Sequence, residues 1–245
     1  MFRQLAAHVA QLCADPAVRA VIVSGAGDRL YTVGADVREM AALARQGPDV
    51  REAGARAWVD AVDTALDAVA AAPRPFICAM KGISFGGGLE LAAACDLRVA
   101  AEGAQFCMPE LRLGIIPGYG GTQRLQRLIG PGATKIWLMT GSVIDITEAH
   151  RIGFVDAVAP PGYEIGRAEQ LAEAIKRQAP LAVAALKQVL RRGADLPLPE
   201  AIELEARVFA ALAASPDVPE GIFSFLEKRD PVWSGACPSS LRGFA

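Results

Sequence analysis

Residues 81–90 read KGISFGGGLE, and this stretch places three successive glycines before an apolar, helix-forming run. Glycine lets a backbone approach a ligand closely, and the first turn of a helix offers unpaired N–H groups to an anion. Side chains on a helix lean toward its N-terminus, so the carboxylate of Glu90 should hang back over Gly87. A second carboxylate, Glu110, follows 20 residues later (110 − 90). The pattern predicts a site where oxyanion donors lie beside acid–base groups.

Short apolar segments alternate with helical patterns on both sides of this stretch. The sequence predicts strands at 20–24, 76–80, 96–100 and 154–158, a short segment at 30–33 before a turn at 34–36, and helices at 2–13, 48–72 and 88–95. This alternation is typical of an α/β fold with a mostly parallel sheet. After residue 165 the pattern is nearly all helical, over 166–191 with a break near Pro180, then 199–214 and 219–229. We therefore predict an α/β core over 1–165 and a helical, oligomerisation region over 166–245.

Composition excludes several classes of protein. The 25 basic and 27 acidic residues give a net charge of −2, which argues against a general nucleic-acid binder. No apolar run reaches the roughly 18 residues of a membrane span. Five cysteines without CxxC spacing indicate reduced thiols, and two histidines argue against a histidine-based metal site. We expect a cytoplasmic protein with no metal, no membrane partner and no nucleic-acid partner.

Five segments follow one another along the chain in a recognisable order. They are YTVGADVREM at 31–40, GGGLEL at 86–91, LGIIPGYGGTQRL at 113–125, the run from Thr140-Gly141 to Phe154-Val155, and FLEKR at 225–229. Together they resemble the crotonase, or enoyl-CoA hydratase/isomerase, superfamily over nearly the whole chain. The resemblance implies a core of repeated ββα units with a C-terminal helical region. It also implies a homotrimer or a dimer of trimers, and an acyl-CoA thioester as the substrate.

The resemblance assigns chemistry to four residues. The backbone N–H groups of Ala35 and Gly87 would form an oxyanion hole for the thioester oxygen. Glu90 and Glu110 fall on both glutamate positions of the family's hydratases: Glu90 would orient and deprotonate the attacking water, and Glu110 would deliver the proton to the α-carbon. This implies reversible hydration of trans-2-enoyl-CoA through a thioester enolate, in fatty-acid or related acyl-CoA degradation. No cofactor is expected, since coenzyme A enters as part of the substrate.

The resemblance also outlines the substrate path. The residues that it places along the acyl-CoA are Ala35, Asp36, Val37, Arg38, Met40, Gly87, Gly118 and Lys228. Met40 would be a wall of the acyl pocket, and Lys228 matches a position near the nucleotide phosphates that a neighbouring subunit sometimes supplies. Asp36 has a structural alternative, an Asx bond that holds its own turn. For Lys228, a solvated charge cluster with its charged neighbours is an equal alternative.

The start of the sequence departs from the family. Members usually carry a strand pair and an Asn-Ala-Leu-type segment before the first helix, whereas this sequence begins in that helix. Either the start of the sequence was assigned late, or the protein lacks the strand pair. In the second case we expect an exposed sheet edge and the loss of part of the coenzyme A wall.

Other functions stay open at this point. Residues 82–86 match the G-x-S-x-G elbow of serine hydrolases, and Ser84, Asp145 and His150 follow the chain order of a triad, although the last two share one segment. An enoyl-CoA isomerase or a specialised acyl-CoA dehydratase would use the same scaffold. A non-catalytic acyl-CoA- or RNA-binding protein is a further alternative, with a local basic patch at Arg124, Arg127 and Lys135.

Overall fold

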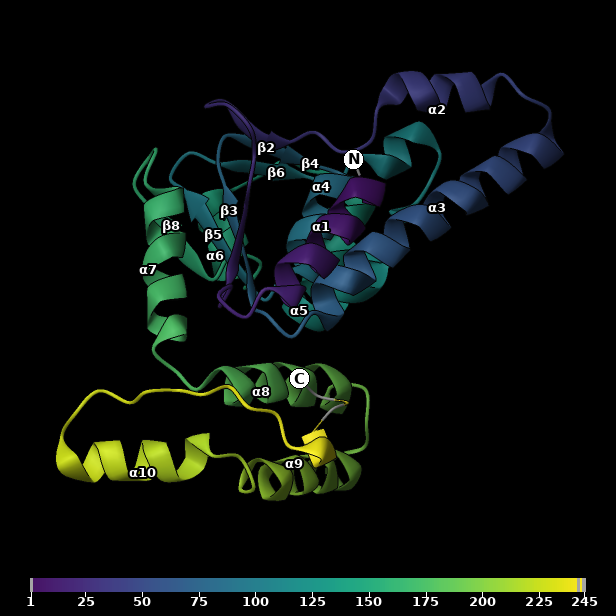
Figure 1. Cartoon of the computed structure of the whole chain (residues 1–245). Helices are drawn as coiled ribbons and strands as arrows, with labels where there is room; N and C mark the ends of the chain where they lie inside the picture. The colour runs from purple at the N-terminus through teal and green to yellow at the C-terminus, as the bar shows by residue number, and fades with distance from the viewer. Residues whose placement is uncertain (1, 242, 244–245) are drawn as a thin grey trace.

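The computed structural model of the chain describes residues 2–241 and 243 and contains two four-stranded sheets with helices packed around them (Figure 1). The first sheet has the order β1 (Val21–Ser24), β3 (Phe76–Met80), β5 (Leu97–Ala101) and β8 (Ala157–Ala159). The second has the order β2 (Leu30–Thr32), β4 (Ile83–Phe85), β6 (Gln105–Cys107) and β7 (Ile144–Asp145). All neighbouring strands are parallel except β6 and β7. The predicted α/β class with a mostly parallel sheet is confirmed.

Strands β1 to β6 alternate between the two sheets along the chain. The helices of this half are α1 (Phe2–Ala14), α2 (Val37–Ala44), α3 (Pro48–Ala71), α4 (Gly87–Ala94), α5 (Gly121–Thr140) and α6 (Ile146–Arg151). The pairs β1–β2, β3–β4 and β5–β6 each send one strand to either sheet, and helices α2 and α3, α4, and α5 follow them in turn. This is the repeated ββα unit that the resemblance implied. Within the described residues, β1 and β2 are edge strands.

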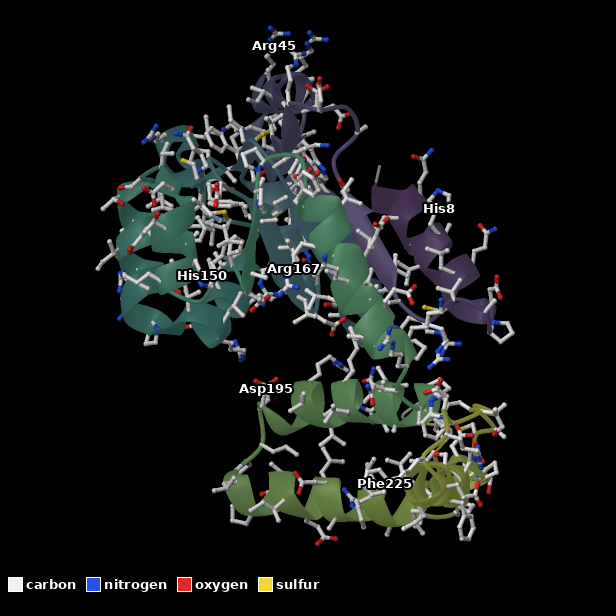
Figure 2. All side chains as sticks on the ribbon, turned by 90° about the vertical axis from the view of Figure 1, so that its left-hand side faces the viewer. His8, Arg45, His150, Arg167, Asp195 and Phe225 are labelled. Atoms are coloured by element: carbon white, nitrogen blue, oxygen red, sulfur yellow. The ribbon has the colours of Figure 1, made fainter. Side chains whose placement is uncertain are left out.

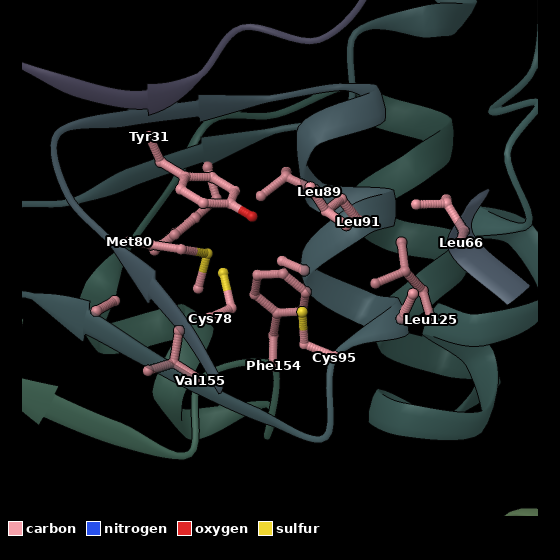
Figure 3. Packing of buried hydrophobic residues seen from close by; sticks show 14 of the residues in the cluster. Tyr31, Leu66, Cys78, Met80, Leu89, Leu91, Cys95, Leu125, Phe154 and Val155 are labelled. Atoms are coloured by element: carbon pink, nitrogen blue, oxygen red, sulfur yellow. The ribbon is translucent and has the colours of Figure 1, made fainter. Parts of the chain in front are cut away.

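The main hydrophobic core lies where these helices meet the strands. Figure 3 shows Leu89 and Leu91 of α4 close to Tyr31, Leu125 and Phe154, which come from three other segments. All of α4 except Ala93 is buried. A helix that is apolar on every side is stable only in such a core, and its burial carries the first turn of α4, with Glu90, into the interior.

Four further helices complete the chain. They are α7 (Glu164–Lys176), α8 (Pro180–Gly193), α9 (Leu198–Leu212) and α10 (Asp217–Glu227). Helix α7 packs on the first sheet through Ala168 and its neighbours, whereas α8, α9 and α10 lie together beyond the end of α7 (Figure 1). The division into a core and an oligomerisation region stays a prediction. No helix in the described part of the chain is long and apolar enough to cross a membrane.

The strand predicted over 154–158 is shifted in the structure. Strand β8 covers Ala157–Ala159, and the N–H groups of Phe154 and Val155 both donate to the carbonyl of Ala149, at 2.9 and 3.1 Å. Phe154 fills the core instead, with its ring centroid 5.8 Å from Phe106 and 5.3 Å from Trp137. Apolar residues at a helix end therefore looked like part of a strand.

Candidate active site

Glu90 lies in the first turn of α4, and its carboxylate is enclosed by protein. Gly86, just before the helix, has φ 56° and ψ −130°, a conformation that L side chains rarely adopt. Glu90 is 1% exposed, and its Oε1 accepts hydrogen bonds from the N–H groups of Tyr119 and Gly121, each at 2.8 Å. A Cβ added to Gly87 would lie 3.8 Å from Glu90 Oε2. The carboxylate therefore lies back over Gly87, as the helix geometry predicts.

Glu110 approaches the same helix end from β6, the strand that pairs with β4 in the second sheet. It follows β6 and begins a short 3-10 helix, Glu110–Leu113, in which it is 9% exposed. A Cβ added to Gly86 would lie 3.0 Å from Glu110 Oε1. Glu110 Oε2 is buried and has no hydrogen-bond partner among the described residues. The structure thus brings both predicted carboxylates to the two glycines at the start of α4.

The surroundings of both carboxylates favour their neutral form. Burial raises the pKa of Glu90 against the opposing effect of its two backbone hydrogen bonds, and with the smaller contributions of the Glu110 and Asp63 charges the resulting pKa is about 7. Burial also raises the pKa of Glu110. A carboxyl group that titrates near neutral pH can both accept and release a proton during a reaction.

Backbone donors from a second segment lie against the start of α4. A Cβ added to Gly34 would lie 3.1 Å from the Gly87 nitrogen and 3.1 Å from the Phe85 oxygen, so only glycine allows this close approach. Ala35 follows directly. Within the described part of the chain, neither the N–H of Ala35 nor that of Gly87 has an acceptor. Two N–H groups on adjoining segments thus remain available beside the carboxylates.

Tyr119 and Gly121 belong to the site, although the sequence interpretation gave them no catalytic part. A Cβ added to Gly87 would lie 2.9 Å from both Cδ2 and Cε2 of Tyr119, so the ring covers this glycine. Burial raises the pKa of Tyr119 to about 12, with Glu90 and Glu110 adding to the effect. The only local signal was the glycine-rich run 118–121, in which Gly118 lies near Val59 on α3, at 3.4 Å from an added Cβ.

The remaining predicted substrate residues divide into two groups. Asp36 caps α2, and its Oδ1 accepts from the N–H of Arg38 at 2.8 Å, which is the structural role considered for it. Val37 and Arg38 are exposed and Met40 is half-buried on the same helix, next to the Gly34 loop. Lys228 instead caps α10, at the opposite end of the molecule from α2 (Figure 1). One chain does not bring Lys228 to the glutamates.

The serine-hydrolase alternative finds no triad. Ser84 is fully buried in β4, and its Oγ has no hydrogen-bond partner in residues 2–241 and 243. Asp145 caps α6 by accepting from the N–H of Glu148, and His150 Nδ1 pairs with the carbonyl of Val155 at 2.8 Å. Asp145 and His150 thus each serve their own local structure, and neither bonds to Ser84.

The basic patch considered for RNA is partly neutralised. Arg124 pairs with Asp67 at 2.6 Å and Arg127 with Asp195 at 3.0 Å. The described residues contain no group of three or more His, Cys, Asp or Glu side chains placed to hold a metal ion. The expectation that no metal or cofactor takes part stays a prediction.

Comparison with known proteins places this geometry in a family. The model of the enoyl-CoA hydratase/isomerase family matches residues 1–236. A crotonyl-CoA hydratase of Syntrophomonas wolfei is 40% identical over 215 residues, which are 88% of this chain and 80% of that protein. A carnitinyl-CoA dehydratase of Citrobacter koseri is 36% identical over 90% of this chain and 83% of its own length. The crystal structure of an enoyl-CoA hydratase from Bacillus anthracis superposes with a TM-score of 0.89 at 35% identity, covering 96% of this chain and 88% of that one. The chain therefore belongs to the enoyl-CoA hydratase/isomerase family, within the crotonase superfamily that its sequence resembles.

Proposed function

We propose that this enzyme reversibly hydrates trans-2-enoyl-CoA thioesters to 3-hydroxyacyl-CoA. The observation that carries the proposal is the pair of buried carboxylates, Glu90 and Glu110, on either side of the Gly86–Gly87 backbone. Relatives named crotonyl-CoA hydratase and short-chain-enoyl-CoA hydratase support a short acyl chain. Fatty-acid or related acyl-CoA degradation as the pathway, and a cytoplasmic location, stay predictions from the sequence.

In this mechanism the N–H groups of Ala35 and Gly87 hold the thioester oxygen. Addition of water to the β-carbon moves negative charge onto that oxygen and forms an enolate. Preorganised donors stabilise such developing charge, and one donor commonly contributes about 3–4 kcal/mol. The availability of both N–H groups, at the positive end of α4 and in the adjoining loop, supports this role.

The two glutamates would divide the proton transfers. Glu90, held at Oε1 by two N–H groups, keeps Oε2 over Gly87 to orient the water and accept its proton. Hydroxide then bonds to the β-carbon while the α,β-double bond becomes the enolate. Glu110 gives its proton to the α-carbon, which regenerates the thioester carbonyl. The raised pKa of Glu110 fits an acid that starts protonated. The reverse sequence removes water.

The rest of the substrate path is proposed from position. Asp36, Val37, Arg38 and Met40 follow the oxyanion loop and would line the pantetheine and acyl path, with Gly118 beside the water. Lys228 lies too far away in its own chain, so a neighbouring copy would bring it to the nucleotide phosphates (Figure 1). This requires the trimer or dimer of trimers that the sequence predicts.

A specialised dehydratase is the second candidate. Its support is the carnitinyl-CoA dehydratase relatives and a carboxylate, Asp63 of α3, whose charge acts on Glu90. Asp63 Oδ1 is buried without a partner among the described residues. A cationic or hydroxylated acyl group would suit such a wall better than a plain alkyl chain.

The deciding experiment follows the loss of conjugated-thioester absorbance from crotonyl-CoA, with Glu110→Gln alongside. Fast loss in the wild type and a drop of about 10²–10⁴-fold in kcat in the variant would support hydration by these residues. Dehydration of carnitinyl-CoA without crotonyl-CoA hydration would favour the second candidate. Equal rates in wild type and variant would reject the assigned role of Glu110.

A further inference from the structure

The backbone turn at 118–121 binds the carboxylate of Glu90 and is itself bound by the side chain of Arg124. Arg124, in the first turn of α5, donates from Nη1 to the carbonyl of Tyr119 at 2.8 Å. Its Nη2 donates to Asp67 Oδ1 on α3 at 2.6 Å. One guanidinium therefore connects the Tyr119 backbone to a neighbouring helix.

The turn has little stiffness of its own. Residues 118, 120 and 121 are all glycine, which gives this segment more conformational freedom than any other residue type would. Gly120 has a φ of 80°, and the Arg124 guanidinium occupies the space that a side chain there would fill. Yet the N–H groups of Tyr119 and Gly121 must both point at Glu90 Oε1. A turn this flexible can hold both N–H groups in a fixed direction only if another part of the protein restrains its backbone.

We propose that Arg124 and Asp67 are a positioning pair that acts on Glu90 through the Tyr119–Gly121 turn. The guanidinium fixes the carbonyl of Tyr119, and the N–H groups of Tyr119 and Gly121, which precede and follow it in the turn, then keep their direction toward Glu90. Asp67 fixes the guanidinium through one charge-assisted hydrogen bond, which Nη2 donates to Asp67 Oδ1 at 2.6 Å. Neither residue touches the substrate, so the effect reaches the chemistry only through the carboxylate.

The pair is suited to a positioning role because it adds little to folding. The side chain of Asp67 is 72% exposed and that of Arg124 is 20% exposed. Because water screens the pair at its Asp67 end, the attraction between the two charges contributes little stability. Loss of the pair should therefore disturb the site far more than the fold.

The electrostatic consequence has a definite direction. The groups that act on Glu90 are Glu110 from the 3-10 helix, Asp63 from α3, and the N–H groups of Tyr119 and Gly121. Only the two N–H groups favour its charged form. If the turn loosens, those bonds weaken and the pKa of Glu90 rises. Arg124 also lowers the pKa of Asp63, so its loss raises that pKa as well.

The test compares Arg124→Met with Arg127→Met. Arg127 lies one turn further along α5 and is 53% exposed. It pairs with Asp195 at 3.0 Å and touches no residue of the 118–121 turn. Figure 2 shows Asp195 at the connection between α8 and α9. The control therefore removes a more exposed arginine–aspartate pair from the same helix without touching the turn.

On crotonyl-CoA we expect Arg124→Met to lower kcat by about 10- to 100-fold, the effect of misplacing a reacting group by about 1 Å. KM should change little, because no substrate contact is lost. The pH limb that belongs to Glu90 should move to higher pH. Arg124→Lys should recover part of the lost kcat. Asp67→Asn should lower kcat by less, and because Asp67 is exposed this variant should fold normally. Arg127→Met should behave as wild type. Equal kcat and equal pH profiles for Arg124→Met and Arg127→Met would overturn the inference.

The inference rests on the proposed function only when activity is the readout. The titration of Glu90 can also be followed by carboxyl ¹³C NMR in protein labelled at the glutamate δ-carbon, with Glu90→Gln assigning the signal. If the wild type hydrates nothing, the proposed function fails. A pKa of Glu90 that is higher in Arg124→Met than in Arg127→Met still supports the positioning pair, and identical values reject it.

Discussion

The carboxylate of Glu90 is held by hydrogen bonds, yet in its ionised form it destabilises the folded state. Two N–H groups bind its Oε1, yet its pKa is about 7, because the loss of water on burial outweighs both hydrogen bonds. An ionised carboxyl in this position costs folding free energy. Functional sites often carry such costs, since the same burial makes the group an effective base near neutral pH.

This cost should be visible in the pH dependence of stability. Because the folded pKa of Glu90 lies above its unfolded value, its contribution favours folding below about pH 4.5 and is lost as pH rises to about 7. Glu90→Gln cannot ionise, so the variant does not lose this stability as the pH rises. We expect the variant to melt at a higher temperature than wild type at pH 8, with the advantage shrinking toward pH 5. Calorimetric melting at the two pH values checks this, and a constant difference would contradict it.

Gly121 should tolerate no side chain. A Cβ there would lie 2.6 Å from Glu90 Oε1 and 2.9 Å from its Cγ, so Gly121→Ala must push the carboxylate off its donors. We expect kcat to fall about 10²-fold. Gly132→Ala on the same helix is the matched control, since a Cβ there meets nothing within 4 Å. Steady-state kinetics of the two variants should diverge, and equal kcat values would show that the carboxylate relaxes freely.

At the scale of elements, α8 is tied to the core by a buried ion pair. Lys187 Nζ lies 2.7 Å from Asp96 Oδ2 and also donates to the carbonyls of Val69 and Arg74, at 3.2 and 3.0 Å. Asp96 in turn accepts from the N–H of Phe76 at 2.7 Å. Side-chain exposure is only 7% for Lys187 and 27% for Asp96. The pair therefore joins the end of α3, the start of β3 and the end of α4 to the C-terminal helical region.

Breaking this pair should destabilise the fold. Lys187→Met leaves Asp96 without its cation in a site where burial already raises its pKa. We expect a loss of about 3 kcal/mol in urea unfolding, at the low end for a buried pair, because Asp96 is partly exposed. Adding Asp96→Asn to Lys187→Met should recover part of it. Lys176→Met removes an exposed pair with Glu173 on α7 and should change little. Equal losses in both single variants would contradict the argument.

At the scale of the molecule, the C-terminal helices present an apolar face to solvent. Phe209 of α9 is 75% exposed, and Phe225 and Leu226 of α10 are 82% and 68% exposed; they line a hollow of about 590 Å³ between these helices. Figure 2 shows Phe225 on this outer part of the chain. Apolar patches of this kind usually mark an interface. Their location agrees with an assembly that completes the substrate path.

Charging this face should separate the copies. The wild type should sediment at three or six times the chain mass of 25.7 kDa. Phe225→Glu with Leu226→Glu should shift it to the mass of one chain. Coenzyme A binding should weaken in parallel if a neighbour supplies Lys228. Tyr163→Glu, which replaces an exposed aromatic residue outside this face, is the control. A wild type that sediments as a single chain would remove the predicted trimer.

Local chemistry in the sequence was enough to determine the framework of this protein. Gly86 permits a backbone conformation that L side chains rarely adopt, and α4 begins directly after it, so the position of Glu90 over Gly87 followed from neighbouring residues. Strand β3 lies at the predicted 76–80, because five successive apolar residues between a proline pair and a glycine have no other stable place. The order of the family's motifs then indicated the ββα core.

Only the tertiary structure decided what surrounds the carboxylates. The donors to Glu90 Oε1 come from 29 and 31 residues further along the chain, and Asp67 meets Arg124 across 57 residues. The displaced strand β8 and the position of Lys228 away from the site also depended on how the elements pack. The pKa of Glu90 depends on how many atoms exclude water from it, a property of the packed interior. Such contacts join segments that no local pattern connects, so they appear only once the whole chain has folded.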